Sequence, residues 1–238
     1  MQKTDKNSPI APYFSLLGRA ILFQGMEEGE IARLYSCLHC WTQEFKKGEY
    51  LFLAEEKITA AGILLEGRTC AESPRLSGEQ SIVQTFSPGE MFGDLLMSGG
   101  SPGSPVSMRA AEGCRVLYLP FDRIMDGCAE NCAAHRQLRV NLLTEISEKF
   151  FRLNRKIRYL SNRSMRSRIA EFLLDCMSDT GSRTFNTALS REDLAALLGV
   201  NRAALSRELS RMQAEGLLTF YKSSFKIGDP DKLRDCFR

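Results

Sequence analysis

The sequence predicts an α+β chain in which a β jelly roll comes first, a long helix follows, and a winged helix-turn-helix domain ends the chain. Short β-prone runs alternate with glycine turns between Trp41 and Leu119, an apolar seam recurs from Leu138 to Leu160, and residues 189–216 carry two capped helices around a glycine. We place the domains at 1–133, 134–162 and 163–238.

The jelly roll is predicted from many short strands separated by regular turns such as Pro88-Gly89-Glu90. Before it, residues 1–27 contain two prolines and are expected to pack loosely, and Glu28–Ser36 is expected to form a short helix. The predicted strands are Gln43–Phe45, Tyr50–Leu53, Ile63–Leu65, Ile82–Phe86, Val106–Met108 and Val116–Leu119.

The long helix is predicted from apolar side chains that recur at steps of four or three over about 35 Å, at 1.5 Å rise per residue. One face could pack on the jelly roll of the same chain, but a helix this long with so strict a stripe favours pairing with a second copy. We therefore predict a parallel homodimer. Its interface is expected to contain Leu138, Leu142, Ile146, Phe150, Leu153, Ile157 and Leu160.

Residues 189–216 have the signals of two short helices joined by a sharp turn. Ser190 stands three positions before Asp193, which is typical of a capping box. Gly199 stands where the chain must reverse, because a positive φ costs glycine little, and Asn201 is placed to cap the second helix. The buried stripe of that helix is predicted to be Leu205, Leu209 and Met212.

The segments around these helices complete a winged domain. We expect a hinge at Ser161–Ser167, a supporting helix at Met165–Met177, and a β-hairpin over 217–227 with Ser223-Ser224 at its tip. A short last helix is expected to begin near Asp229-Pro230-Asp231.

Arg202 and Arg207 point away from the buried stripe of the second helix. A helix-turn-helix presents its recognition helix to the major groove of DNA in this way. The sequence therefore predicts a DNA-binding protein. The alternatives are an amphipathic hairpin with a solvated charged face and a scaffold whose helix-turn-helix contacts protein.

Composition is consistent with a regulator inside the cell. The formal net charge is +3, and the excess lies in residues 161–238, although so small an excess would not identify DNA binding alone. The N-terminus has no apolar signal core and no run approaches about 18 apolar residues, so a cytoplasmic protein is expected. The eight cysteines are expected to be thiols rather than disulfides.

The order of these parts resembles the Crp/Fnr family of bacterial transcription regulators over most of the chain. The resemblance implies a cyclic-nucleotide-binding-like barrel, a homodimer, double-stranded DNA with a two-fold symmetric operator, and RNA polymerase as a further partner. The matching segments are Phe92-Gly93-Asp94-Leu95 after Ser87-Pro88-Gly89-Glu90, Leu119-Pro120-Phe121-Asp122, and Leu189-Ser190-Arg191-Glu192-Asp193-Leu194 through Leu217-Leu218.

The resemblance also assigns the DNA contacts. An arginine fork suits guanine because it bonds O6 and N7 together. The family commonly has Glu where this chain has Ala203, and an alanine methyl could touch a thymine methyl instead, so the half-site is expected to differ at that base pair. Base contacts are implied for Arg202, Ala203, Ser206 and Arg207, and phosphate contacts for Ser190, Arg191, Asn201 and Lys222.

The effector prediction also rests on the resemblance. In cyclic-nucleotide-binding relatives a Gly-Glu-Leu segment holds the ribose, and Gly93, Asp94 and Leu95 match it. The Arg-Ser pair that holds the phosphate is replaced by Ser104-Pro105, and no Arg lies between Arg75 and Arg109. We therefore expect an unidentified small-molecule or redox signal rather than cyclic AMP. The Gly99–Pro105 loop could cradle a small anion with backbone N–H groups, or form a plain turn.

Cysteine and histidine offer other sensing chemistries. Cys37 and Cys40, with Cys128 and Cys132, could supply four thiolates, and some family members hold an iron–sulfur cluster on cysteines near the N-terminus. Residues 1–36 have no cysteine, so we expect idle or buried thiols and no metal, with redox or iron–sulfur sensing as the alternative. His39 and His135 are the only histidines, and heme is not expected.

No enzyme is predicted. A cupin-type enzyme on such a barrel would need several histidines and carboxylates around one metal, and no P-loop, GxGxxG or Ser/His/Asp arrangement is present. The working hypothesis is a ligand near Asp94 and the seam at Leu138–Ile146 that shifts the two long helices. The hinge would then change the spacing of the recognition helices, which couples ligand binding to DNA affinity.

Overall fold

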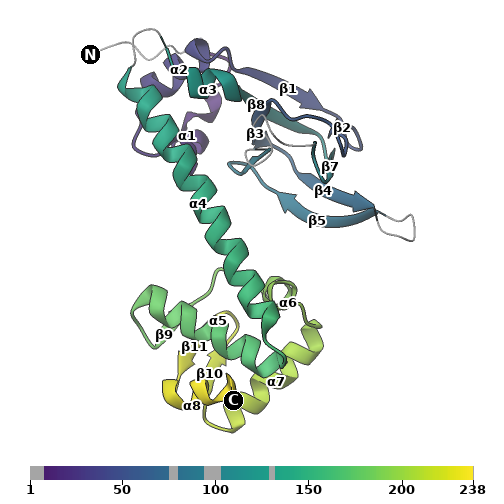
Figure 1. The fold of residues 1–238 in the computed structure, drawn as a ribbon, viewed down its shortest axis with the longest axis vertical. Helices are drawn as coiled ribbons and strands as arrows, with labels where there is room; N and C mark the ends of the chain where they lie inside the picture. The colour runs from purple at the N-terminus through teal and green to yellow at the C-terminus, as the bar shows by residue number, and fades with distance from the viewer. Residues whose placement is uncertain (1–7, 75–79, 94–102, 129–131, 238) are drawn as a thin grey trace. The chain divides into compact units, whose positions relative to one another are not determined.

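Two antiparallel four-stranded sheets with covering helices form the first part of the chain, and a winged helix domain forms the last part (Figure 1). The computed structural model describes residues 8–74, 80–93, 103–128 and 132–237. Two compact units are present, Met1–Glu148 and Lys149–Arg238, and helix α4 (Ala133–Ser161) contributes residues to both. The predicted α+β fold class is confirmed.

All six predicted strands lie in the two sheets of the first unit. Each of the six predicted runs overlaps a strand, whereas β4 and β6 were missed, because β4 is largely polar and β6 has only two residues. One sheet has the order β1 (Trp41–Phe45), β8 (Cys114–Pro120), β3 (Ala60–Glu66), β6 (Met91–Phe92); the other has β2 (Tyr50–Phe52), β7 (Ser107–Ala110), β4 (Thr69–Pro74), β5 (Gln80–Phe86).

Strand β3 is buried on both faces. Ile63 packs in the core that the helices cover, whereas Leu64 packs in the core between the sheets, as the alternation of strand side chains requires. Gly62 belongs to the second face, and a Cβ there would lie 2.3 Å from the ring of Phe92. Only glycine fits that position without displacing Phe92 from the core.

The N-terminal segment is part of the core, so the loose packing expected for residues 1–27 is wrong for its described residues. Ile10, Tyr13, Phe14 and Leu17 are buried at helical spacing. Pro12 lies at the start of a helical turn, where proline is tolerated. The helices here are η1 (Ala11–Tyr13), α1 (Phe14–Leu17), η2 (Ile21–Phe23), α2 (Glu28–Cys37) and, after the sheets, α3 (Phe121–Asp126).

The seam of α4 divides into two parts. Leu138 and Leu142 are buried in the core of their own unit, and Ile146 packs against the same core. These three residues were expected in the dimer interface. That expectation is wrong for Leu138 and Leu142, because the N-terminal helices already cover them. The remaining seam residues are exposed: Phe150, Leu153, Ile157 and Leu160.

The second unit has the predicted winged helix order. The wing tip is Lys222-Ser223 and not Ser223-Ser224, because Tyr221 pairs with Ser224 and Lys222 adopts a positive φ of 52°. Strand β9, which pairs with β11, was missed. The elements are α5 (Met165–Thr180), β9 (Thr184–Asn186), α6 (Arg191–Leu198), α7 (Arg202–Ala214), β10 (Leu218–Tyr221), β11 (Ser224–Ile227), α8 (Pro230–Arg234) and η3 (Asp235–Phe237).

Within the described residues, no helix has both the length and the apolar character needed to cross a lipid bilayer.

Candidate nucleic-acid interface

The caps of α6 and α7 form as predicted. Ser190 Oγ accepts a hydrogen bond from Asp193 N at 3.1 Å, and Asp193 Oδ2 accepts one from Ser190 N at 3.2 Å. Asn201 Oδ1 accepts from the amides of Ala203 and Ala204 at 2.9 and 3.3 Å. Between the helices, Gly199 has φ 63°. These local bonds fix the angle at which the second helix leaves the first.

Helix α7 has a fully buried inner face and an open outer face. Leu205, Leu209 and Met212 on the inner side have no exposed surface, as predicted. Arg202, Ala203 and Arg207 are exposed and Ser206 is half-buried. Within the part of the chain that the structure describes, no hydrogen bond or ion pair holds the guanidinium of Arg202 or Arg207. Both forks are therefore available to an external acceptor.

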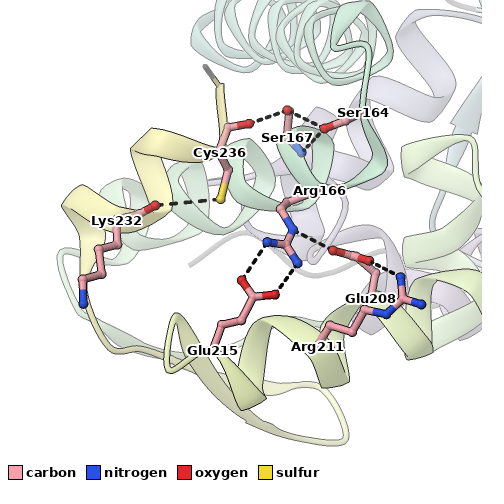
Figure 2. Close-up of polar contacts among 8 residues, drawn as sticks. All are labelled: Ser164, Arg166, Ser167, Glu208, Arg211, Glu215, Lys232 and Cys236. Atoms are coloured by element: carbon pink, nitrogen blue, oxygen red, sulfur yellow. Dashed lines mark hydrogen bonds and ion pairs between the residues drawn. The ribbon is translucent and has the colours of Figure 1, made fainter.

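Arg166 of α5 fastens the far end of α7. Figure 2 shows its guanidinium between the carboxylates of Glu208 and Glu215. Both terminal nitrogens donate to Glu215 at 2.7 Å, and Nε donates to the buried Glu208 at 2.7 Å. These bonds lower the pKa of Glu215 and raise the pKa of Arg166. Arg211 lies 3.4 Å from the same Glu208 (Figure 2).

Arg168 holds the turn between α6 and α7. Its Nε donates to the carbonyl of Asn162 at 3.0 Å, and its Nη1 donates to the carbonyl of Leu198 at 3.0 Å. One side chain thus joins the exit of α4 to the C-terminus of α6, whose last carbonyls have no partner within the helix. This role of Arg168 was not predicted, because nothing in its local sequence pattern distinguishes it from other arginines.

The segment predicted as a hinge, Ser161–Ser167, is spanned by side-chain bonds from α4 to α5. Tyr159 OH donates to Asp175 at 2.8 Å, and Arg158 pairs with Glu171 at 2.8 Å. The compact units separate earlier on α4, between Glu148 and Lys149. The last turns of α4 therefore belong to the winged domain.

The wing is tied to α6 by Arg191. Its Nη2 donates to the carbonyl of Lys222 at 2.8 Å, and its guanidinium lies 5.1 and 5.5 Å from the ring centroids of Phe220 and Phe225. Burial lowers the pKa of Arg191. Arg191 was predicted to contact a phosphate, whereas in this structure it positions the wing. Lys222 at the tip is exposed.

Two family models match the chain. One is a Crp-like helix-turn-helix domain, matched by residues 167–236, and the other is a cyclic nucleotide-binding domain, matched by residues 42–131. The chain belongs to the Crp/Fnr family. It is a transcription regulator with a DNA-binding helix-turn-helix domain, and regulators of this family bind DNA and usually act as dimers.

Relatives of the Crp/Fnr chain are regulators rather than enzymes. It is 23% identical to the CRP-like cAMP-activated global transcriptional regulator of Mycobacterium tuberculosis, over 92% of this chain and 96% of the relative. It is 28% identical to the transcriptional activator protein Anr of Pseudomonas protegens, over 79% and 77%. The structure of the Thermus thermophilus catabolite activator protein shares the fold, with a TM-score of 0.52 and 20% identity over 92% of this chain and 98% of that one.

The two described polar residues nearest to the expected phosphate position, Ser104 and Arg109, are both engaged within this Crp/Fnr regulator. Ser104 is buried, and its hydroxyl donates to the carbonyl of Val106 at 2.6 Å. Arg109 Nε donates to both oxygens of the buried Glu72 at 3.0 and 3.1 Å. Gly93 has φ 77°. The predicted effector residues Asp94 and Leu95, and most of the Gly99–Pro105 loop, lie outside the described residues.

The cysteines singled out from the sequence do not meet as one four-thiolate set in the described residues. Cys40 is buried, and burial raises the pKa of its thiol to about 12. His39 is exposed with a positive φ of 54°. Instead, Cys37 lies close to Cys128 and His135. No described cysteine forms a disulfide.

Proposed function

We propose that the chain is a homodimeric regulator that recognises a two-fold symmetric operator through Arg202 and Arg207. The observation that carries the proposal is a contrast within the winged domain: among the described residues these two guanidinium groups have no partner, whereas Arg166, Arg168 and Arg191 do. Bidentate contact with guanine is worth about 1–3 kcal/mol per base. Ala203 lies between them on the exposed face and offers only a methyl group, so a thymine methyl is its proposed contact.

Phosphate contacts are proposed for exposed groups beside the recognition face. The amide N–H₂ of Asn201 is a donor, because its carbonyl already caps α7. Lys222 at the wing tip supplies a charge, and Ser190 lies at the N-terminus of α6, where partial positive charge favours a phosphate. Such contacts set the register on DNA and the salt dependence of binding. In this proposal Arg191 acts through the wing and does not contact DNA directly.

The homodimer is proposed from the exposed part of the α4 seam. Phe150, Leu153 and Ile157 each expose more than half of their surface. Their spacing of three and four residues is that of a coiled-coil seam, and the ion pairs of Arg155 and Arg158 to α5 lie on the other face of the helix. A second copy would cover this stripe with its own. Two recognition helices are also what a symmetric operator requires.

The signal is proposed to be something other than cyclic AMP. Burying a phosphate without a cation or donor set is costly. Pro105 has no N–H to offer, Ser104 is used internally and Arg109 is held by Glu72. Within the proposal, an unidentified effector acts on the first unit, and the regulator works with RNA polymerase in the cytoplasm.

Fluorescence anisotropy with duplexes from the protein's own promoter region tests the DNA proposal. We expect affinity to fall steeply with salt and to be lost in Arg207→Ala. Arg211→Ala is the matched control, because this exposed arginine lies one turn further on α7 but pairs with Glu208. Affinity that is indifferent to both salt and Arg207→Ala would favour a protein-binding scaffold.

Sedimentation and calorimetry test the other parts. Wild-type protein is expected to sediment as a dimer and a Leu153→Asp, Ile157→Asp variant as a monomer, with Arg152→Asp on the polar face as control. A monomeric wild type at micromolar concentration would contradict the dimer. Calorimetric titration with cyclic AMP is expected to show no binding, and saturable binding at one site per chain would contradict the effector proposal.

A further inference from the structure

Three side chains that are far apart in the sequence converge in the first unit. Cys37 is the last residue of α2, Cys128 follows α3, and His135 lies in the first turn of α4. One potential ligand atom from each lies within 4.8 Å of the other two. In the sequence Cys37 is close to Cys40, and Cys128 is close to Cys132. In the fold the three-residue cluster contains one cysteine of each pair, together with His135.

The histidine has an unusual environment. His135 is only 1% exposed, and its Nε2 is enclosed without a hydrogen-bond partner in the described residues. Its Nδ1 lies 3.7 Å from Cys132 Sγ. Burial of a ring nitrogen that lacks a partner is unfavourable, so this position is explained best if the ring has a ligand.

The sulfur of Cys128 accepts a backbone donor. The amide N–H of Cys132 points to Cys128 Sγ at 3.4 Å. Hydrogen bonds to sulfur stabilise the thiolate over the thiol and are a common feature around metal-bound cysteines. The bond also brings Cys132 beside Cys128, so that a further thiol stands next to the three-residue cluster.

Thiolates and imidazole together fit zinc. Zn²⁺ is borderline-soft and takes Cys and His ligands in tetrahedral sites with Zn–S near 2.3 Å, which places neighbouring sulfurs about 3.7 Å apart. The separations here need only a small closure to reach that geometry. Iron–sulfur clusters are usually held by thiolates alone, so the imidazole favours a single ion.

We propose that Cys37, Cys128 and His135 bind one Zn²⁺ ion per chain, with a water molecule at the fourth position. Binding releases the thiol protons to solvent, and no redox step is involved. The ion links the end of α2 and the segment after α3 to the first turn of α4. It therefore fixes the start of the long helix to the unit that carries the sheets. This assignment does not depend on the proposed operator or effector.

Cobalt substitution of the full-length protein tests the site. Co²⁺ is expected to bind with one-to-one stoichiometry and to give thiolate-to-cobalt absorption in the near ultraviolet, and Zn²⁺ is expected to displace it. Cys37→Ser and Cys128→Ser are expected to remove the absorption and weaken Zn²⁺ binding by about 100-fold or more. Cys37 is exposed, so its replacement does not disturb the core. Cys132→Ser is expected to weaken binding less, because Cys132 is not a proposed ligand.

Two cysteines outside the proposed site serve as controls. Cys176→Ser and Cys236→Ser, in the other unit, are expected to leave the spectrum unchanged. Zn²⁺ is expected to raise the melting temperature of the wild type but not that of Cys37→Ser. The test therefore does not depend on a replacement of the buried His135, such as His135→Gln, that folds. Absence of a thiolate band in the wild type, or a band that survives Cys37→Ser and Cys128→Ser, would overturn the assignment. Iron with acid-labile sulfide in the protein purified without oxygen would overturn it too.

Discussion

The arginines of the winged domain fall into two groups that differ in what holds them. Arg166, Arg168 and Arg191 each donate to carboxylates or carbonyls of the domain itself, whereas Arg202 and Arg207 point outward with no such bonds in the described residues. The first group stabilises the winged domain, whereas the guanidinium groups of the second are accessible to a binding partner. All five arginines carry the same charge, so the two groups are distinguished only by the hydrogen bonds that each guanidinium makes within the domain.

The largest expected effect comes from removing the outward pair. An Arg202→Ala, Arg207→Ala variant is expected to lose sequence preference, with operator affinity falling about 10³-fold or more toward the nonspecific level. Its thermal unfolding by circular dichroism is expected to match the wild type, because neither side chain bonds to a described residue of the domain. A lower melting temperature would show that the two groups of arginines are not distinct.

Removing Arg166 is expected to have the opposite signature. The change Arg166→Ala leaves the buried Glu208 without its main partner, and breaking such a pair costs about 3–5 kcal/mol when both groups are fully buried. Arg166 is about one-third exposed, with 32% of its side-chain surface accessible, so we expect about 2–3 kcal/mol in urea unfolding. Arg166→Lys should recover only part of this, since lysine cannot make the paired bonds to Glu215. An unchanged unfolding midpoint would contradict the structural role.

Arg191 is the arginine for which the structure and the family resemblance predict different roles, one in holding the wing and one in contacting a phosphate. Its contacts with two aromatic rings and one carbonyl predict that Arg191→Ala lowers stability by about 1–2 kcal/mol. If Arg191 is held, the slope of log affinity against log salt stays the same. If it contacts a phosphate, as the family resemblance implied, the slope becomes shallower by about one for each Arg191 removed. Salt titrations of Arg191→Ala, with Lys222→Ala as a known exposed charge, separate these outcomes.

The smallest expected effect concerns Arg109, one of the arginines of the first unit that bond within the protein. Hydrogen bonds from Arg109 lower the pKa of Glu72 below its usual value. The pair therefore stabilises the folded state at neutral pH, and this stabilisation is lost as the pH falls through the lowered pKa. Glu72→Gln is expected to reduce the loss of stability between about pH 5 and pH 3. Identical acid unfolding of the two proteins would show that Arg109 is not engaged by Glu72 in solution.

Local signals in the sequence were sufficient where structure is local. The capping box at Ser190, the turn at Gly199 and the cap at Asn201 depend on neighbours within a few residues, and each forms as predicted. The strand β9 was missed because Thr184–Asn186 is short and pairs with β11, which is distant in the chain. Strand β6 is also short and pairs with the distant β3, whereas β4 was missed because it is largely polar.

Features that depend on tertiary contacts were not predictable. The seam of α4 has one uniform pattern, yet its first part is buried by Tyr13, Phe14 and the helices around them, and periodicity alone cannot show which chain covers a stripe. The bonds of Arg168 and the meeting of Cys37 with Cys128 and His135 arise from topology. For Cys37 the spacing suggested Cys40 as a partner, whereas the fold places it beside Cys128 and His135.

The two hydrogen bonds of Arg168 have a consequence for the mutants that a genetic screen would find. Because one guanidinium ties the exit of α4 to the end of α6, the tilt between the two short helices cannot change independently of the helix that enters the domain. Loss of this side chain uncouples the two. A screen for mutants that regulate constitutively is therefore expected to recover replacements of Arg168.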